Sequence, residues 1–178
     1  SDCSGGAGVQ ADLKTFTTLN CYGMSVITAI TAQNTIGVFD VFQIPLSVIE
    51  SQLNAIFSDI DVTIVKIGMI YDKEIIHLIS DFLSKKFLCQ SAKKVVVDPV
   101  MLSKSNIDLL RDDALIALRE KLLSIAFLVT PNLDEVIRIC QDTRYQNCHD
   151  VRDENDIFIL GKKILSFGCS NVLIKGGH

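Results

Sequence analysis

Short apolar runs alternate with amphipathic stretches along the whole chain. The apolar runs, such as MSVITAI and TIVKI, are rich in β-branched residues, which is typical of buried strands. The stretches between them carry apolar residues three and four positions apart, which predicts helices. The predicted strands cover residues 24–30, 38–44, 63–67, 95–97, 126–129 and 172–174. The predicted helices cover residues 9–19, 45–57, 72–83, 112–122, 132–140 and 156–167.

This alternation determines the predicted fold class. Buried strands separated by helices indicate a mainly parallel sheet with helices on both faces, so we predict an α/β fold. Asp72 is a predicted helix N-cap, and Gly168 stands where the last helix should end. Residues 142–153 form a polar loop, and the chain contains neither an internal repeat nor a Gly/Pro-rich linker. We therefore expect residues 1–178 to form a single domain.

Composition and charge narrow the classes of partner. The net charge of −4 argues against a nucleic-acid or anionic-membrane surface, which would need a basic face. No apolar run is long enough to span a membrane. The six cysteines form no CxxC pair and no metal-ligand spacing, so we expect reduced, free thiols. Together these features predict a cytoplasmic protein that binds neither nucleic acid nor membrane.

Polar residues and glycines gather just after the predicted strands. In an open parallel sheet, ligands bind in the crevice beyond the carboxyl ends of the strands, so these segments should share one binding edge. The segments are Gln33-Asn34, Gly68-Met69, Asp98-Pro99, Thr130-Pro131-Asn132 and Lys175-Gly176-Gly177.

The glycine-rich segment before the first helix has two interpretations. Gly5 and Gly6 could let backbone N–H groups approach an anion or a flat ring, or they could serve only a turn with positive φ. Asp12, on the first turns of that helix, could accept a hydrogen bond from a substrate hydroxyl. Its spacing alone favours a surface charge that complements the helix dipole.

The later strand ends carry a second set of candidates. Asp98 leaves a buried strand as an isolated carboxylate, which suits magnesium or phosphate chemistry. Asn132 and Glu135 are three residues apart, which favours a helix capping box and leaves contact with a hydrated Mg²⁺ as the alternative. Lys175 is either a phosphate-binding cation or an ordinary lysine at a strand end.

The order of the motifs resembles a known family. The segments SGGAGVQADLKTF, SVITAITAQNT, KIGM, VVVDPVM, TPNLDE and KGGH follow one another as in hydroxymethylpyrimidine/phosphomethylpyrimidine kinases of the ribokinase-like superfamily. The resemblance covers nearly the whole chain and is weakest in residues 142–155. It implies a three-layer ribokinase-like fold, mainly parallel, with ATP and Mg²⁺ as cofactors and a homodimer as the full-length form.

The resemblance also implies roles for the candidate residues. Gln33 would read the pyrimidine edge with its amide, and Asp12 would contact the hydroxymethyl group. Met69 and Val100 would form the apolar walls around the ring, beside the glycine turn. Lys175 would contact the nucleotide phosphates. Asp98, Asn132 and Glu135 would organise Mg²⁺ and phosphate, directly or through water.

Two departures from the family pattern concern the ends of the sequence. The family has a strand before the SGGAG turn, and its G-T-G-[CD] segment, which supplies the catalytic residue, falls beyond His178. The resemblance therefore implies a fragment without its first strand and without its catalytic C-terminal segment. We expect this fragment to be inactive by itself. Cys3 also stands where the family usually has Pro or Ser.

The predicted function is ATP-dependent phosphorylation of 4-amino-5-hydroxymethyl-2-methylpyrimidine and of its monophosphate in thiamine biosynthesis. One alternative is a pyridoxine or pyridoxal kinase on the same scaffold, because both substrates are flat heteroaromatic rings with a hydroxymethyl group. The other alternative is a non-catalytic pyrimidine-binding module.

Overall fold

The protein was analysed as a computed structural model that describes residues 1–70, 72–87, 92–101 and 112–176. Cys89, Gly177 and His178, which entered the sequence predictions, lie outside the described residues. Within the described part of the chain, no helix is long and apolar enough to cross a membrane.

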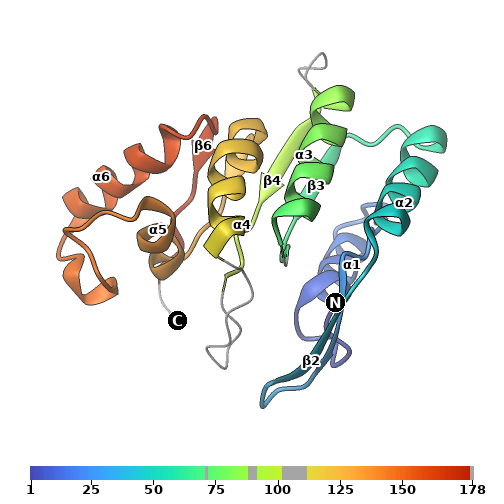
Figure 1. The fold of residues 1–178 in the computed structure, drawn as a ribbon, viewed down its shortest axis with the longest axis horizontal. Coiled ribbons are helices and arrows are strands. Elements are labelled where there is room, and N and C mark those ends of the chain that lie inside the picture. The colour runs from blue at the N-terminus through green and yellow to red at the C-terminus, as the bar shows by residue number, and fades with distance from the viewer. Residues whose placement is uncertain (71, 88–91, 102–111, 177–178) are drawn as a thin grey trace.

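A four-stranded parallel sheet forms the centre of the structure, as Figure 1 shows. Its strands are β3 (Ile64–Ile67), β4 (Lys94–Val97), β5 (Leu128–Val129) and β6 (Asn171–Val172), and they lie in that order. Each strand pairs with the next in parallel, for example at Ile67↔Val97 and Val97↔Val129. The α/β class and these four predicted strands are therefore confirmed, and the predicted strand over residues 38–44 is confirmed in a separate sheet.

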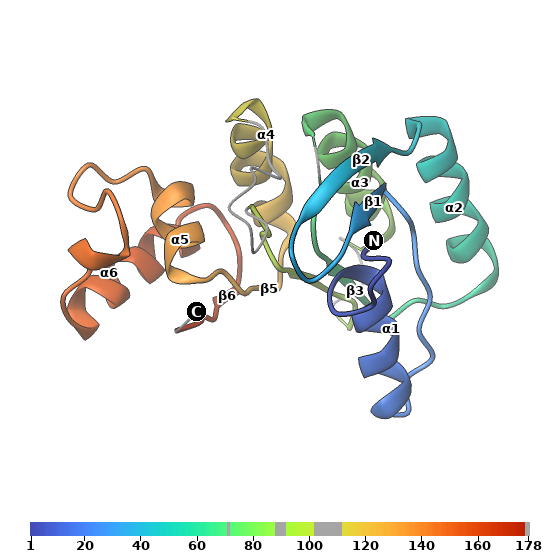
Figure 2. The same cartoon turned by 90° about the horizontal axis from the view of Figure 1, so that it is seen from below.

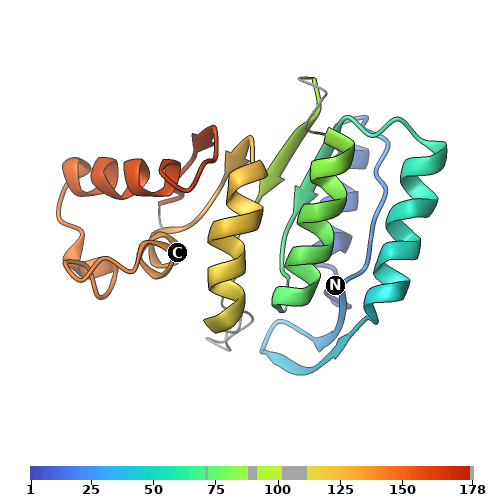
Figure 3. The same cartoon turned by 45° about the horizontal axis from the view of Figure 1, so that its top comes forward.

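Helices cover the sheet from two sides. Helices α2 (Leu46–Asp59), α3 (Lys73–Phe87) and α4 (Asp112–Ala117) lie side by side on one face, while α1 (Gly8–Thr18) lies on the other (Figures 2 and 3). The α4 helix continues through a π-helical turn, Leu118–Leu122, and a 3₁₀ turn, Leu123–Ile125. The chain ends with α5 (Leu133–Cys140), a 3₁₀ turn at Cys148–Asp150, and α6 (Glu154–Leu165).

The hydrophobic core lies where the helices meet the sheet. Strand residues Val95 and Val97 are buried, whereas Ile64 on the opposite face of the sheet is 62% exposed. Helix α6 packs against the β6 segment at Gly161, where a Cβ would lie in ordinary van der Waals contact, 3.7 Å from both Val172 and Ile174. The largest fully buried side chains include Ile49, Ile75, Ile76, Leu83, Met101, Leu122, Leu123, Ile139, Leu160 and Ile164.

Two predicted helix ends are confirmed, at Asp72 and at Gly168. Asp72 accepts hydrogen bonds from the backbone N–H groups of Glu74 (3.1 Å) and Ile75 (3.2 Å), as an N-cap does. Gly168 follows α6 with φ +101°, a conformation that favours glycine. Helix α6 begins two residues earlier than predicted, because Asp153 caps it by accepting a bond from Asp156 N (3.0 Å).

The prediction of a buried strand over residues 24–30 was wrong. The strand here is β1 (Ala29–Gln33), and it pairs antiparallel with β2 (Val38–Gln43) in a separate two-stranded sheet. The preceding segment packs against α2 instead. The Gln52 side chain accepts a hydrogen bond from Ile27 N (2.9 Å) and donates one to Ile27 O (3.1 Å), taking the place of a neighbouring strand.

The β1–β2 hairpin extends from the carboxyl edge of the parallel sheet, at the bottom of Figure 1. Ile30 and Phe42 are directly opposite each other in the hairpin, and they are 50% and 63% exposed. The N-terminal segment lies at the same edge. The hairpin thus brings Gln33 toward the edge where the sequence predicts ligand binding.

Candidate functional site

The glycine-rich turn before α1 is organised by a buried carboxylate, Asp2. Its oxygens accept hydrogen bonds from Ser4 N (2.9 Å), Ser4 Oγ (2.8 Å), Gly6 N (3.1 Å) and Ala7 N (2.8 Å). These bonds, that from the Ser4 hydroxyl foremost, hold the pKa of Asp2 below its ordinary value. Gly5 and Gly8 have φ of +76° and +60°. Gly5 therefore serves a turn with positive φ, whereas Gly6 has no positive φ.

The same geometry shows where two backbone donors of this turn go, while ligand binding at the turn stays a prediction. The N–H of Gly6 is bonded to Asp2 and the N–H of Gly5 to the Asp2 carbonyl (2.9 Å), so these two donors serve the protein itself. What the two glycines offer a ligand is a surface without side chains. Sequence reasoning missed Asp2, although a carboxylate just before a Ser-Gly-Gly turn is a recognisable signal for such a loop.

Gln33 lies beside this turn because the first residues run along β1. Thr31 Oγ1 donates to Ser1 O (2.6 Å), and Cys3 Sγ contacts Gln33 O (2.9 Å). The Gln33 side chain is half-buried, with its Oε1 3.3 Å from Thr31 Oγ1. These contacts fix the amide next to the glycine surface.

Asp12 and Lys66 join α1 to the end of β3. The Lys66 Nζ lies 2.7 Å from Asp12 Oδ1, and each side chain is 31% exposed. A Cβ at Gly68 would lie 3.8 Å from this Nζ, so the ion pair stands beside the KIGM loop. Thr28 Oγ1 donates to the carbonyl of half-buried Met69 (3.4 Å), which ties that loop to the hairpin. Lys66 belongs to a motif that sequence analysis singled out, but its pairing with Asp12 was not predicted.

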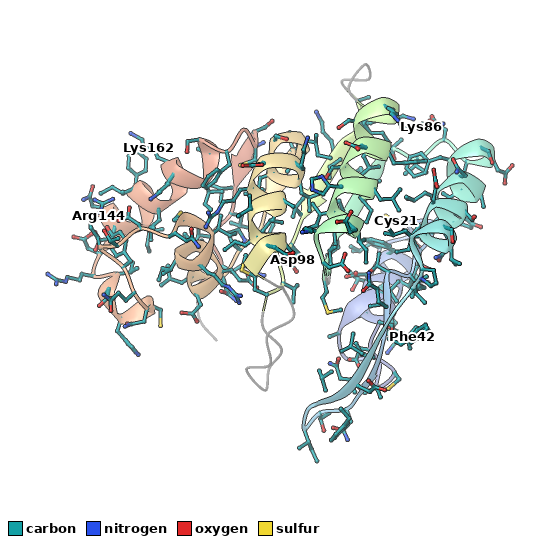
Figure 4. The ribbon with its side chains drawn as sticks, viewed as in Figure 1. Cys21, Phe42, Lys86, Asp98, Arg144 and Lys162 are labelled. Carbon is teal, nitrogen blue, oxygen red and sulfur yellow. The ribbon has the colours of Figure 1, made fainter. Side chains whose placement is uncertain are left out.

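A second cluster forms where β4, β5 and β6 end. Asp98 accepts hydrogen bonds from Lys175 Nζ (2.7 Å) and Thr130 Oγ1 (3.3 Å). Lys175 N donates to Pro131 O (2.8 Å), and Lys175 forms a parallel β-bridge with Asn132. Figure 4 shows Asp98 at the lower ends of α3 and α4, on the carboxyl side of the sheet. Three predicted loop segments therefore meet at one ion pair.

Asn132 and Glu135 form the capping box that their spacing favoured. Glu135 N donates to Asn132 Oδ1 (2.8 Å), and Asn132 N donates to Glu135 Oε2 (2.7 Å). Glu135 is only 7% exposed, and this burial raises the pKa of its carboxyl, while the Asn132 backbone bond and Lys175 act in the opposite direction. The cap accounts for both side chains, and a role at a metal ion stays a prediction.

The residues suit a hydrated Mg²⁺ better than a cage made of protein ligands alone. Among the described residues, no group of three His, Cys, Asp or Glu side chains is placed to hold a metal. Asp98 and Glu135 are close enough that the charge of Asp98 raises the pKa of Glu135. Mg²⁺ is commonly held by one or two carboxylates together with water and substrate phosphates. These two carboxylates fit that description.

The two clusters are joined by the loops that follow β3 and β4. Asp98 N donates to Ile67 O (2.8 Å). Gly68, Pro99 and Val100 line the same small pocket of about 10 Å³. Met69 and Val100 both remain half-buried, so each keeps some surface available for a ligand. Met69 and Val100 thus follow the neighbouring strands β3 and β4 at the carboxyl edge of the sheet, and their role as ring walls stays a prediction.

This arrangement defines a class of protein. A parallel α/β sheet, a glycine turn beside an antiparallel hairpin, and a carboxylate–lysine cluster at the carboxyl edge together indicate a protein of the ribokinase-like fold. Residues 2–178 match the model of the phosphomethylpyrimidine kinase family. The chain belongs to this family.

Individual relatives agree with the family assignment. The chain is 47% identical over 178 residues to the hydroxymethylpyrimidine/phosphomethylpyrimidine kinase of Rhizobium meliloti, and it spans 63% of that protein's length. A crystal structure of phosphomethylpyrimidine kinase from Clostridium difficile is 47% identical, with a TM-score of 0.85, and the match covers all of this chain and 72% of that one.

A second kind of kinase is also similar. The Staphylococcus aureus pyridoxal kinase in complex with AMP-PCP and pyridoxal is 35% identical, with a TM-score of 0.79. The match covers 99% of this chain and 59% of that one. The three-layer ribokinase-like architecture is therefore confirmed.

Proposed function

We propose that the full-length protein phosphorylates 4-amino-5-hydroxymethyl-2-methylpyrimidine and then its monophosphate, with ATP as the phosphoryl donor. The observation that carries this proposal is the position of Gln33, held by Thr31 and Cys3 beside the glycine turn at the carboxyl edge of the sheet. The family to which the chain belongs supports the same reaction.

The substrate half of the proposed site suits an aminopyrimidine. The Gln33 amide can both donate and accept a hydrogen bond, as the ring nitrogen and the exocyclic amine require. Met69 and Val100 supply apolar surface for the two faces of the ring, and the glycine turn leaves room for its edge. The Asp12 carboxylate has a second oxygen, besides the one that contacts Lys66, with which to accept a bond from the hydroxymethyl group.

The phosphate half would lie at the Asp98–Lys175 cluster. In phosphoryl transfer the protein acts chiefly by positioning the reactants and stabilising charge. We assign Lys175 to a nucleotide phosphate and Asp98, Asn132 and Glu135 to the organisation of hydrated Mg²⁺. When bound, Mg²⁺ would neutralise charge on the phosphates. The resemblance to the family implies a catalytic residue in the segment after His178.

We further propose that the enzyme is a cytoplasmic homodimer. The free thiols of Cys3, Cys21, Cys140, Cys148 and Cys169 suit a reducing compartment. The exposed Ile30–Phe42 pair on the hairpin provides apolar surface of the kind that a symmetric interface buries.

A pyridoxine or pyridoxal kinase is the second candidate function. It is favoured by the 35% identity to the pyridoxal kinase of Staphylococcus aureus. Apolar walls and a hydroxymethyl contact serve both ring systems, so these features do not distinguish the two substrates. Gln33, like Met69, discriminates poorly between the two ring systems, so assaying both substrates side by side separates the two candidates.

Substituting Gln33 with Ala tests the proposed site. Loss of the amide bonds should lower kcat/KM for the pyrimidine alcohol roughly 10- to 100-fold in the full-length protein, mainly through KM, because each net hydrogen bond contributes about 1 kcal/mol. Gln146→Ala, which truncates an exposed glutamine in the polar loop, is the matched control and should leave the kinetics unchanged. Unaltered pyrimidine kinetics in Gln33→Ala would show that the substrate lies elsewhere.

A further inference from the structure

The proposed reaction sequence presents the site with two acceptors of different charge. The first acceptor is a neutral hydroxymethyl group, and the second is a phosphate monoester that carries a charge of about −1.5 to −2 at pH 7. The proposed hydroxymethyl contact is Asp12, itself an anion. A phosphate at the same carbon would be repelled by Asp12 unless a cation stands next to it.

The structure holds such a cation at Lys66. Its Nζ lies 2.7 Å from Asp12 Oδ1, beside Gly68 in the loop that also carries Met69. The Lys66 side chain is 31% exposed, so its ammonium is accessible. Two other lysines at this edge make different contacts: Lys14 donates to Gly5 O (2.9 Å), and Lys175 pairs with Asp98 (2.7 Å). Of these three lysines, Lys66 is therefore the one that pairs with Asp12, the proposed contact of the hydroxymethyl group.

We propose that Lys66 binds the phosphate of the monophosphate substrate. In the first step Lys66 pairs with Asp12, and in the second step it leaves Asp12 and pairs with this phosphate. With the alcohol bound, Lys66 neutralises Asp12 and orients its free oxygen toward the hydroxyl. With the monophosphate bound, the ammonium turns to the phosphate oxygens. This inference rests on the proposed function and explains how one pocket accepts both substrates.

The energetics permit such an exchange. A partly exposed ion pair contributes only about 0.2–1 kcal/mol, so breaking the contact with Asp12 costs little. The bond to the phosphate is charge-assisted like the bond it replaces, and the phosphate dianion carries more negative charge than the Asp12 carboxylate. In the second step an ionised phosphate oxygen forms the new P–O bond to the γ-phosphorus of ATP while the bond to ADP breaks. That oxygen needs no base, so Lys66 acts only by binding and orienting the acceptor.

The test compares the two acceptors in Lys66→Met, a variant of similar length without the charge. In the full-length protein, KM for the monophosphate should rise at least about tenfold, because hydrogen bonds to charged groups contribute about 1.5–3 kcal/mol. KM for the alcohol should change less than about threefold, in line with the small energy of an exposed ion pair. Lys66→Arg should restore most of the binding of the monophosphate.

Lys93→Met is the matched control. Lys93 also forms an ion pair of 2.7 Å, with Asp61, but it stands at the start of β4, at the opposite edge of the sheet. Its removal changes the net charge equally and should leave the ratio of the two KM values unchanged. If Lys66 had only a structural role, Lys66→Met would change KM for the alcohol and KM for the monophosphate by the same factor. That result overturns the inference.

A measurement on the wild-type protein keeps the inference testable if Lys66→Met folds poorly. Rising salt should increase KM for the monophosphate much more than KM for the alcohol, because salt screens an exposed cation–phosphate contact. Equal salt dependence of the two KM values overturns the inference. A wild type that phosphorylates neither pyrimidine overturns the proposed function, whereas a wild type that phosphorylates both with equal responses to Lys66→Met overturns only the role of Lys66.

Discussion

Individual carboxylates in this chain take their properties from the donors around them. Asp142 follows α5 and is only 11% exposed, and it accepts hydrogen bonds from Arg144 Nε (2.9 Å), Arg144 Nη2 (2.7 Å) and Lys163 Nζ (3.3 Å). Figure 4 shows Arg144 at the left of the view, near α5 and α6. The Arg144 side chain foremost, and then the Arg144 backbone N–H and Lys163, hold the pKa of Asp142 well below its usual range.

This lowered pKa gives a prediction about acid stability. A carboxyl whose pKa is lower in the folded than in the unfolded state stabilises the protein above its unfolded pKa, about 3.9, and loses that contribution as pH falls through the folded pKa. Asp142→Asn should therefore lower the free energy of unfolding at pH 7, and the difference from wild type should shrink below about pH 4. Urea unfolding of the full-length protein at several pH values measures this.

The control for this prediction is Asp81→Asn, which changes an exposed carboxylate on α3. It should alter the free energy of unfolding little at any pH. A pH-independent loss in Asp142→Asn would contradict the assignment, because it would mean that packing rather than ionisation of Asp142 stabilises the fold.

Residue roles were predictable from the sequence where the chemistry is local. Asn132 and Glu135 are three residues apart, so their capping box could be read directly from the spacing. The ion pair of Lys66 with Asp12 joins residues 54 positions apart, and Asp98 with Lys175 joins residues 77 apart. No local pattern encodes such distances. Sequence reasoning could place these side chains at one edge of the sheet but could not pair them.

At the scale of elements, apolar content predicted burial better than it predicted conformation. The segments of β3 and β4 form strands because they pair with each other, and β4 also pairs with β5. The equally apolar segment before Ala29 did not, because Gln52 of α2 satisfies the Ile27 backbone instead. The Gln52 side chain thus takes the hydrogen bonds that the apolar pattern of residues 24–30 had assigned to a neighbouring strand.

The hairpin is the element on which the proposed homodimer depends. If the Ile30–Phe42 pair forms the interface, Phe42→Asp in the full-length protein should raise the dimer dissociation constant at least about tenfold, because a charge buried at an apolar contact is costly. Sedimentation velocity over a range of protein concentrations measures this.

A matched aspartate substitution controls for exposure. Phe158 on α6 is 59% exposed, close to the 63% of Phe42, and its ring lies 4.4 Å from the ammonium of Lys162 (labelled in Figure 4). Phe158→Asp should leave the dimer intact. A dimer that survives Phe42→Asp, or that dissociates with Phe158→Asp, would place the interface elsewhere.

For the whole molecule, the alternation of strands and helices was sufficient to predict the α/β class. Parallel pairing follows from the helical crossovers, and the carboxyl edge then becomes the expected ligand edge. The separate hairpin sheet was not predictable this way, since antiparallel β1–β2 pairing breaks the alternation. The chain spans 63% of the length of its Rhizobium meliloti relative, and the activity of the whole protein stays a proposal.

The most direct test of the central claim is ATP-dependent phosphorylation by the full-length protein, with three acceptors assayed in parallel. These are 4-amino-5-hydroxymethyl-2-methylpyrimidine, its monophosphate and pyridoxine. We predict that kcat/KM for both pyrimidines exceeds that for pyridoxine at least about tenfold, in line with the family to which the chain belongs. Phosphorylation of pyridoxine alone, or binding of the pyrimidines without turnover, would contradict the claim that this protein is a pyrimidine kinase.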